Sequence, residues 1–364
     1  MTRLYLRPLG FVYGPAAKTA MAEGFALPVA GGPVAFTMAE IVEGVPGKAK
    51  RRMATAGDLS LTKDTDLYAL IGRVTAPRPP IAGISSDRLA SGRPLLMGIV
   101  NVTPDSFSDG GLYDQKEPAV NHAAELIQAG AEIVDIGGES TRPGAETVPG
   151  EDELSRVIPV IEELRGVKAV LSVDTRKAEV ARVSAERGAK IFNDVSALTY
   201  DDESLAVARD AELSVVLMHA KGDPKTMQDK PAYADVVLEV YDYLAARIAA
   251  VREAGIPEEA IIADPGIGFG KNIDHNLDLL AHLSIFHGLG VPLLVGASRK
   301  RFIEGVMGEK NPRNREPGSQ AIAISSAAQG AQILRVHDVA GTRQALDVWH
   351  GTVVGSPENA QSSD

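Results

Sequence analysis

The sequence predicts an α/β protein built around a (β/α)8 TIM barrel, with a small α/β or β-rich appendage in front of it. From Leu95 onward, eight short apolar runs alternate with longer segments of helical periodicity. Each run is nearly continuous in apolar residues, as expected for parallel strands that helices cover on the outside. Eight strand–helix units in about 260 residues favour a closed barrel over an open doubly wound sheet, which stays the alternative fold.

The appendage is set apart by its charge. Residues 1–93 carry 12 Lys and Arg against 7 Asp and Glu, whereas the rest of the chain carries 25 against 41. A turn-rich stretch, Thr75–Gly83, lies near the change in sign. We therefore expect an appendage of unknown role over residues 1–90, a (β/α)8 barrel domain over 91–352 and a flexible tail over 353–364. Within the appendage we predict two strands and the start of a helix, at Leu4–Tyr13, Phe25–Ala30 and Met38–Val42.

The eight predicted barrel strands are Leu95–Val102, Ala131–Ile136, Ala169–Val173, Lys190–Val195, Leu213–Met218, Ala260–Ala263, Pro292–Val295 and Gln332–Val336. Helical spacing between them is clearest in Val120–Ile127, Val236–Leu244 and Ala321–Ala328.

Composition excludes several classes of protein. The 364 residues include no cysteine, which removes disulfides, thiolate zinc sites and iron–sulfur clusters. The formal net charge is −11, so nucleic acid is not an expected partner. The longest apolar stretch, Phe25–Ile41, is broken by prolines and glycines, and we expect neither a membrane span nor a secretory signal. A soluble cytoplasmic protein is the expectation.

Polar residues follow every predicted strand. They include Asn101, Asp135, Asp174, Asn193, Asp194, His219, Asp264, Ser298, Lys300, Arg335 and His337. The carboxyl ends of all strands in a parallel barrel open onto one face, where the active site is assembled. Asp174 or Asn193 taken alone could equally be a helix N-cap, and that interpretation stays open. Cations such as Lys300 and Arg335 do not fit capping, so the pattern predicts a site that binds an anion.

Two strands lead into long loops rich in Gly, Ser, Thr and Pro, Asn101–Gly111 and Gly137–Ala145. Such loops at a barrel mouth commonly carry function, and the hydroxyl of Thr141 with the guanidinium of Arg142 suits a phosphate.

A glycine-rich segment, Asp264–Lys271, needs a separate interpretation. Its spacing fits neither a P-loop nor a dinucleotide fingerprint. We interpret its glycines as letting the backbone and Phe269 approach a flat ligand closely. The following histidines, His275, His282 and His287, are expected on the surface of an outer helix, and no spacing predicts a histidine-built zinc site.

Taken in order, six segments resemble the signature of the dihydropteroate synthase family. They are Met97–Gly111, Asp135–Ala145, Ser172–Thr175, Asn193–Val195, Asp264–Lys271 and Arg335–Val339. The resemblance implies a pterin-binding barrel, a homodimer, and an enzyme that joins 4-aminobenzoate to 6-hydroxymethyl-7,8-dihydropterin diphosphate with Mg²⁺ as cofactor. Its products would be 7,8-dihydropteroate and diphosphate. The appendage departs from the usual plan of this family.

The resemblance also implies roles for individual residues. The catalytic residues would be Thr141, Arg142, Asp174 and Lys300. The pterin would be held by Asp174, Asn193, Met218, Asp264, Phe269 and Lys300, and the diphosphate by Asn101, Thr141, Arg335 and His337. The 4-aminobenzoate would be held by Thr141, Pro143, Phe269, Ser298 and Lys300, and Mg²⁺ by Asn101.

The chemistry of these side chains agrees with such roles. A carboxylate such as Asp264 can accept from the amino group and ring N–H of a pterin, while Asn193 supplies a donor and an acceptor. Arg335 and His337 suit the charge that develops on a departing diphosphate. Sulfonamides mimic 4-aminobenzoate in this family, and the loop Ser140–Ala145 carries no insertion, so we expect sulfonamide sensitivity. Two alternatives stay open, a methyltetrahydrofolate-dependent methyltransferase and a non-catalytic pterin-binding paralogue.

Overall fold

The main body of the protein is a parallel eight-stranded barrel. The computed structural model describes residues 3–103, 116–140, 147–222 and 231–355. The strand order is β10-β9-β8-β7-β6-β5-β12-β11, and the Ala263 amide closes the ring by donating to the carbonyl of Pro292 beside β11 (2.9 Å). The barrel strands are β5 (Leu95–Asn101), β6 (Ile133–Gly137), β7 (Val170–Asp174), β8 (Ile191–Asp194), β9 (Ser214–Met218), β10 (Ile261–Asp264), β11 (Leu294–Val295) and β12 (Ile333–Val336). The predicted (β/α)8 fold is confirmed.

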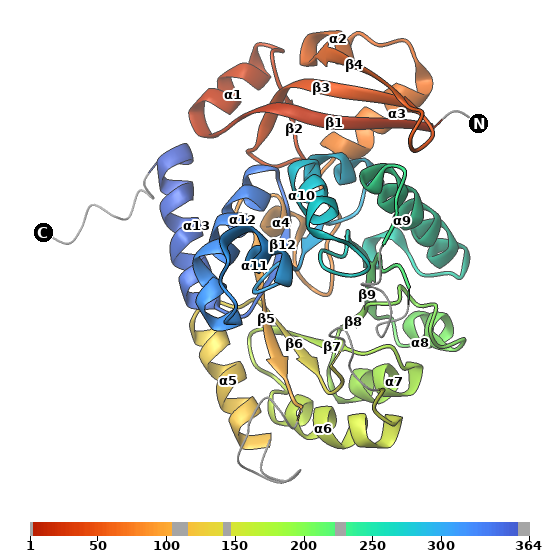
Figure 1. The fold of residues 1–364 in the computed structure, drawn as a ribbon, viewed down its shortest axis with the longest axis vertical. Helices are drawn as coiled ribbons and strands as arrows, with labels where there is room; N and C mark the ends of the chain where they lie inside the picture. The colour runs from red at the N-terminus through yellow and green to blue at the C-terminus, as the bar shows by residue number, and fades with distance from the viewer. Residues whose placement is uncertain (1–2, 104–115, 141–146, 223–230, 356–364) are drawn as a thin grey trace, which may run out of the picture.

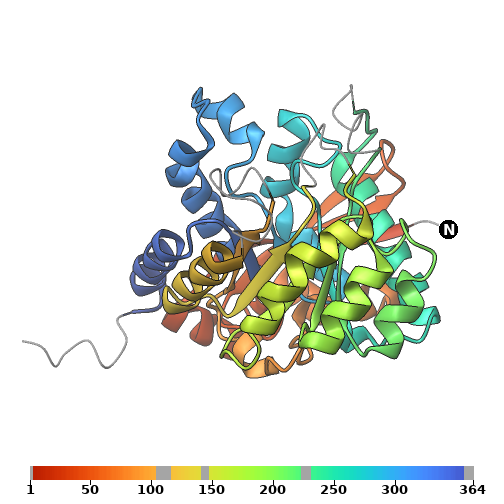
Figure 2. The same cartoon turned by 90° about the horizontal axis from the view of Figure 1, so that it is seen from below.

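Helices surround this barrel. They are α5 (Lys116–Gln128), α6 (Gly150–Glu163), α7 (Ala178–Arg187), α8 (Ser204–Asp210), α9 (Val236–Glu253), α10 (Ile273–Ala281), α11 (Arg301–Met307), α12 (Glu316–Ala328) and α13 (Val339–Val354), with 3-10 segments η2 (Glu258–Ala260), η3 (Leu283–Leu289) and η4 (Pro312–Arg315). Figure 2 shows the gold-to-green helices α5 to α8 side by side along the outside. Side-chain caps begin several of them: Asp235 accepts from the Leu238 amide at α9, and Asp338 accepts from the Gly341 amide at α13.

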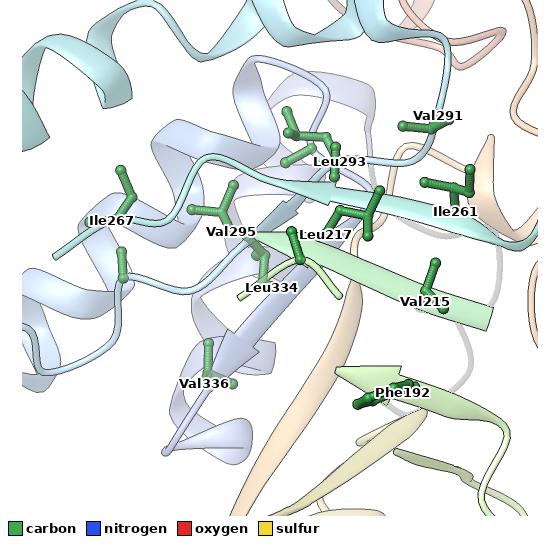
Figure 3. Packing of buried hydrophobic residues seen from close by; sticks show 14 of the residues in the cluster. Phe192, Val215, Leu217, Ile261, Ile267, Val291, Leu293, Val295, Leu334 and Val336 are labelled. Atoms are coloured by element: carbon green, nitrogen blue, oxygen red, sulfur yellow. The ribbon is translucent and has the colours of Figure 1, made fainter. Parts of the chain in front are cut away.

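Alternate residues of each strand pack into two separate cores. In β9, Val216 faces the barrel interior together with residues such as Leu95 and Ile333. Its neighbours Val215 and Leu217 belong to the larger core between strands and helices, part of which Figure 3 shows. Both faces of the strands are therefore buried, which is why these runs lack the polar alternation of a half-exposed strand.

The appendage forms an antiparallel sheet of its own. Its central strand is β3 (Ala35–Gly44), which pairs with β1 (Arg3–Val12) on one side and with β2 (Leu27–Pro28) and β4 (Lys50–Thr55) on the other. Helix α1 (Gly14–Ala22) lies between β1 and β2, and α2 (Ala56–Ser60), α3 (Thr65–Thr75) and α4 (Ser86–Leu89) follow β4.

The expected helix over Met38–Val42 was wrong. This segment is the middle of β3, because Ala39 and Ile41 are buried on one face while Met38 and Glu40 point to the other. A period of two residues places these side chains on a sheet, and five residues were too few to reveal it.

The sheet packs on the outside of its own barrel, beside α9, α10 and η3 (Figure 1). Tyr5 donates to Asp242 of α9 (3.0 Å), and the hydroxyl of Ser284 in η3 donates to the carbonyl of Pro8 (2.9 Å). Arg78, only 1% exposed, donates to the carbonyl of His287 (3.0 Å). His287 itself is fully buried, so its expected surface position was wrong, because this packing covers it.

The expected boundary at residue 90 stays a prediction. Ile81 and Leu89 precede it, yet both pack in the interior core of the barrel. Residues 356–364 of the expected tail lie outside the described residues. None of the described helices is both long enough and apolar enough to cross a membrane.

Candidate active site

The polar residues that end the barrel strands meet at one end of the barrel. Parallel register places Asp174 of β7 opposite Asn193 of β8, and Asp264 of β10 opposite Met218 of β9. Because neighbouring parallel strands end at the same edge, residues from opposite ends of the sequence converge there.

Arg335 lies at the centre of this group. Its Nε donates to Asp135 Oδ2 and its Nη2 donates to Asp174 Oδ2, both at 2.6 Å. Asp135 is fully buried and also accepts from Ser172 Oγ (2.6 Å) and Asn193 Nδ2 (2.9 Å). Asp135 was noted only as a strand-end residue and was missed as a site residue, since no local pattern indicates that it joins Arg335 to Asn193.

The carboxylates of Asp174 and Asp264 can still accept hydrogen bonds from a ligand. Asp174 Oδ1 is buried and has no hydrogen-bond partner among the described residues. Burial raises the pKa of Asp174 to about 7, against the opposing effect of Arg335. Burial likewise raises the pKa of Asp264 to about 6, although the Gly266 amide donates to its Oδ1 (2.7 Å) and Lys300 lies near. Both carboxyl groups are thus held where a hydrogen-bond donor from a ligand would stabilise the charged form.

The glycine-rich segment lies directly against the end of β9. Gly266 has φ +68°, and a Cβ at this position would overlap the carbonyl oxygen of His219. Only glycine permits both this conformation and this approach. The ring of Phe269 faces Lys300, whose Nζ lies 4.0 Å from the ring centroid.

Lys271 holds this segment in place and was missed by sequence reasoning. Its Nζ donates to the carbonyls of Gly266 (2.8 Å) and Phe269 (3.0 Å) and lies 2.9 Å from His219 Nδ1. Lys271 is 2% exposed, and burial lowers its pKa to about 7. Its position at the end of the motif was the only sequence signal for this role.

Ser298 and His337 approach each other from β11 and β12. Ser298 Oγ lies 3.0 Å from His337 Nδ1 and accepts from the His337 amide (3.3 Å). Arg299, between Ser298 and Lys300, adopts φ +58°, which is unfavourable for a side chain of this size. The Ser319 hydroxyl, which accepts from the Arg299 amide (3.0 Å), and an ion pair to Glu316 hold that conformation.

A second buried charge group lies beside β6. Glu139 accepts from Arg176 (2.8 Å) and Lys177 (2.6 Å), and Lys177 also donates to Glu153 (2.5 Å). Glu139 and Glu153 are almost completely buried. These four side chains connect the chain just after β6 with the start of α7 and with α6.

The remaining predicted site residues are Asn101 and those of the two long loops. Asn101 ends β5 opposite Gly137, next to the strand that leads into His337. Thr141, Arg142 and Pro143, and the first loop beyond Thr103, lie outside the described residues. Among the described residues, no group of three or more His, Asp or Glu side chains could hold a metal ion.

Comparison with known proteins identifies the family. The profile of the family described as "Pterin binding enzyme" matches residues 97–337. The chain is 51% identical to the dihydropteroate synthase of Escherichia coli (strain K12) over 261 residues, which is 71% of this chain and 92% of that protein. This chain belongs to the dihydropteroate synthase family. Membership confirms the predicted activity, that of a transferase of folate biosynthesis, and the relatives are synthases rather than methyltransferases.

Solved dihydropteroate synthase structures share the barrel. The Xanthomonas albilineans enzyme with 4-aminobenzoic acid superposes with a TM-score of 0.68 at 50% identity, covering 73% of this chain and 94% of that one. The Yersinia pestis dihydropteroate synthase with a sulfonamide drug complex gives a TM-score of 0.68 at 46% identity, covering 71% and 94%. The sheet β1–β4 lies outside the region that the family profile matches.

Proposed function

We propose that the chain condenses 6-hydroxymethyl-7,8-dihydropterin diphosphate with 4-aminobenzoate. The aniline nitrogen attacks the methylene carbon of the pterin, the bond from this carbon to the diphosphate oxygen breaks, and diphosphate leaves with the electron pair. The aniline nitrogen then loses one proton, which gives 7,8-dihydropteroate. The aniline is already unprotonated at neutral pH, so catalysis consists of positioning and stabilisation of charge.

The observation that supports this proposal best is the buried Asp135–Arg335–Asp174 group beside Asp264. A pterin offers an amino group and ring N–H donors, which match the carboxylate of Asp264 and the unpartnered Oδ1 of Asp174. Asn193, held by Asp135, supplies a further polar contact (2.9 Å between Nδ2 and Oδ2). We assign the faces of the ring to Met218 and Phe269.

We assign the diphosphate and 4-aminobenzoate to the side of the Asp135–Arg335–Asp174 group that faces away from the pterin. Two guanidinium nitrogens of Arg335 are engaged by carboxylates, which leaves Nη1 for the diphosphate, together with His337 and Asn101. Ser298 and Lys300, with Phe269, are assigned to 4-aminobenzoate. We propose that Thr141, Arg142 and Pro143 complete these sites.

Mg²⁺ is proposed as the cofactor, held on the protein by Asn101. One amide oxygen with no cluster of acidic residues among the described ones fits a weak site that gains its remaining ligands from diphosphate and water. When bound, the ion neutralises charge on the leaving diphosphate. Activity should therefore stop with a chelator and return with added Mg²⁺. Calorimetry should detect Mg²⁺ binding only when diphosphate is present, and tight binding to the free enzyme would contradict the assignment.

A homodimer and a cytoplasmic location complete the proposal. Four exposed apolar side chains lie on adjacent helices, Ile273 and Leu277 on α10 and Val306 and Met307 on α11. An exposed apolar surface of this kind commonly marks a protein–protein contact, and a second copy of the chain is the partner we propose. The cysteine-free composition supports a reducing compartment.

A turnover assay with both substrates tests the function. Wild-type protein should release diphosphate and dihydropteroate in equal amounts, which neither a methyltransferase nor a non-catalytic paralogue would do. Asp264→Asn should lower kcat/KM for the pterin diphosphate by roughly 10- to 100-fold, because it removes a charged acceptor. Asp274→Asn, an exposed carboxylate at the start of α10, is the matched control and should keep full activity. No product from wild-type protein would refute the proposal.

A further inference from the structure

The β3–β4 hairpin of the appendage contacts the residues at the start of α9. Arg51 of β4 donates through Nη1 to Glu40 Oε2 of β3 and through Nη2 to Asp235 Oδ2, both at 3.0 Å. The other oxygen of Asp235 caps α9 by accepting from the Leu238 amide (3.1 Å). A single guanidinium therefore links two strands of the appendage to the first turn of a barrel helix.

The turn of the same hairpin touches the residue before Asp235. Gly47 has φ +76°, and a Cβ built on it would lie 3.1 Å from the Cβ of Ala234. Two consecutive barrel residues thus contact the appendage, one through charge and one through close packing.

The segment that these contacts hold continues into the glycine-rich wall of the pocket. Tyr233 donates through its hydroxyl to the carbonyl of Gly270 (2.8 Å), and its ring meets the ring of His275 edge-on at 4.9 Å. Gly270 directly follows Phe269, whose carbonyl accepts from Lys271 (3.0 Å). Only Ala234 separates Tyr233 from Asp235, so the contact with the appendage and the contact with the wall lie two residues apart.

This segment depends on tertiary contacts for its position. Residues 231–235 belong to no helix or strand, so no backbone ladder fixes them. Glu239 accepts from the Ala234 amide (2.6 Å), and Lys221 donates to the carbonyl of Ala232 (2.6 Å). From the appendage come the ion pair of Arg51 with Asp235 and the packing of Gly47 against Ala234.

We propose that Arg51 is a positioning residue for the pterin pocket, acting through Asp235 and Tyr233 on the segment that carries Phe269. The appendage then serves as a brace for the substrate site of its own barrel. This inference rests on the proposed function, because Phe269 is assigned to the pterin there. The region that the family profile matches begins at residue 97, so the brace is an addition to the family's barrel.

The test compares Arg51→Gln with Arg52→Gln in the full chain. Arg52 is the next residue of β4 and is exposed, and its side chain makes no ion pair or hydrogen bond with the residues that the structure describes. Both variants lose one positive charge on the same strand, so a difference between them reports the contacts of Arg51 with Asp235 and Glu40.

Two measurements are made on each variant. Hydrogen exchange in the free enzyme should become faster in Arg51→Gln both at residues 231–240 and at 266–272, and should be unchanged in Arg52→Gln. The KM for the pterin diphosphate should rise about two- to fivefold in Arg51→Gln with kcat within about twofold, as expected for loss of one partly exposed ion pair that acts on binding. A purely structural contact would lower thermal stability without this split between KM and kcat.

A second comparison checks the route. Tyr233→Phe removes the hydroxyl that reaches Gly270, and adding Arg51→Gln to it should raise the KM no further. Equal exchange at 266–272 in Arg51→Gln and Arg52→Gln overturns the inference, and so does an additive double variant. A failure of the proposed function is seen separately, as absence of turnover in wild type and Arg52→Gln alike, and the exchange comparison then still decides the inference.

Discussion

Arg335 combines two tasks that are usually separate, because it neutralises two buried carboxylates and is also assigned to an anionic ligand. Its partners, Asp135 and Asp174, are 0% and 8% exposed in their side chains. Removing one partner of a buried ion pair leaves an uncompensated charge in the interior. The resulting loss of stability is larger than the net stability that the intact pair provides.

We therefore predict that Arg335→Ala lowers the free energy of unfolding by about 3 kcal/mol near neutral pH. The loss should shrink in acid, because protonation of Asp174, whose pKa burial already raises to about 7, removes the uncompensated charge. Denaturant titrations at about pH 5 and about pH 8 measure this difference. By calorimetry, the variant should bind the pterin diphosphate more weakly by about 1.5–3 kcal/mol and lose less affinity for the pterin alcohol. Equal losses would argue against a diphosphate role.

The buried carboxylate of Asp264 lowers the stability of the folded protein near neutral pH, although it is assigned to ligand binding. Burial raises the pKa of Asp264 to about 6. Between about pH 4 and pH 6, the folded protein therefore keeps a proton on Asp264 that the unfolded chain has already released. The stability that this proton contributes is present below about pH 4 and is lost as pH rises through 6.

The side chain introduced by Asp264→Asn does not titrate, so on going from acid to neutral pH the stability of this variant relative to wild type should rise by about 3 kcal/mol. Pterin alcohol should bind wild type more tightly at about pH 8 than at about pH 5, and should bind the variant weakly at both. Unfolding and binding measured across this range, with Asp274→Asn as control, check both statements. A variant with the pH dependence of wild type would contradict them.

At the scale of elements, the barrel ends are built from segments that have little regular structure. The glycine-rich segment owes its course to Lys271 and to the contact of Gly266 with His219, whereas the turn at Arg299 depends on Ser319 and Glu316. Each segment is thus held by one or two buried polar groups that the sequence pattern does not single out.

The second loop carries the prediction about inhibitors. Ser140–Ala145 has no insertion that would narrow the slot against a bulky sulfonyl group, so substrate and mimic should compete on similar terms. We predict that sulfamethoxazole inhibits competitively with 4-aminobenzoate and requires the pterin diphosphate, which completes the slot. Steady-state kinetics measures this, and an inhibition constant about a hundredfold above the KM for 4-aminobenzoate would overturn the prediction.

At the scale of the whole molecule, the exposed surface on α10 and α11 belongs to the barrel, and the appendage packs beside the end of α10, where Arg7 donates to the carbonyl of Ala281. Leu277 is 41% exposed and Met307 48%, although both are apolar. Such side chains gain free energy when a second molecule removes them from water.

We predict a dimer of twice 38.3 kDa in solution, which Leu277→Arg converts to a monomer because a charge would be buried in the contact. Leu61→Arg is the control, since Leu61 is 81% exposed but lies in the appendage. Light scattering on the two variants checks the prediction. A monomeric wild-type protein would exclude the dimer. A dimer that persists in Leu277→Arg would show that the contact lies elsewhere.

The sequence by itself determined the barrel and the end of it that holds the site. Runs such as residues 215–218 are apolar throughout because both faces of each strand are buried, and this property is visible residue by residue. Polar residues at the strand ends followed from the same pattern, since all parallel strands end on one face. Those expectations needed no knowledge of which strands are neighbours.

Only the tertiary structure decided which residues touch. Arg335 meets Asp135 across 200 residues because β12 closes against β5, and Arg51 meets Asp235 because the appendage packs on α9. His287 is buried, and Met38–Val42 is a strand, through packing that a short window of sequence does not contain. A local pattern reports the periodic buried face of a strand or helix, whereas the partners of a side chain, and the burial of one outside such a face, depend on the packing of the whole molecule.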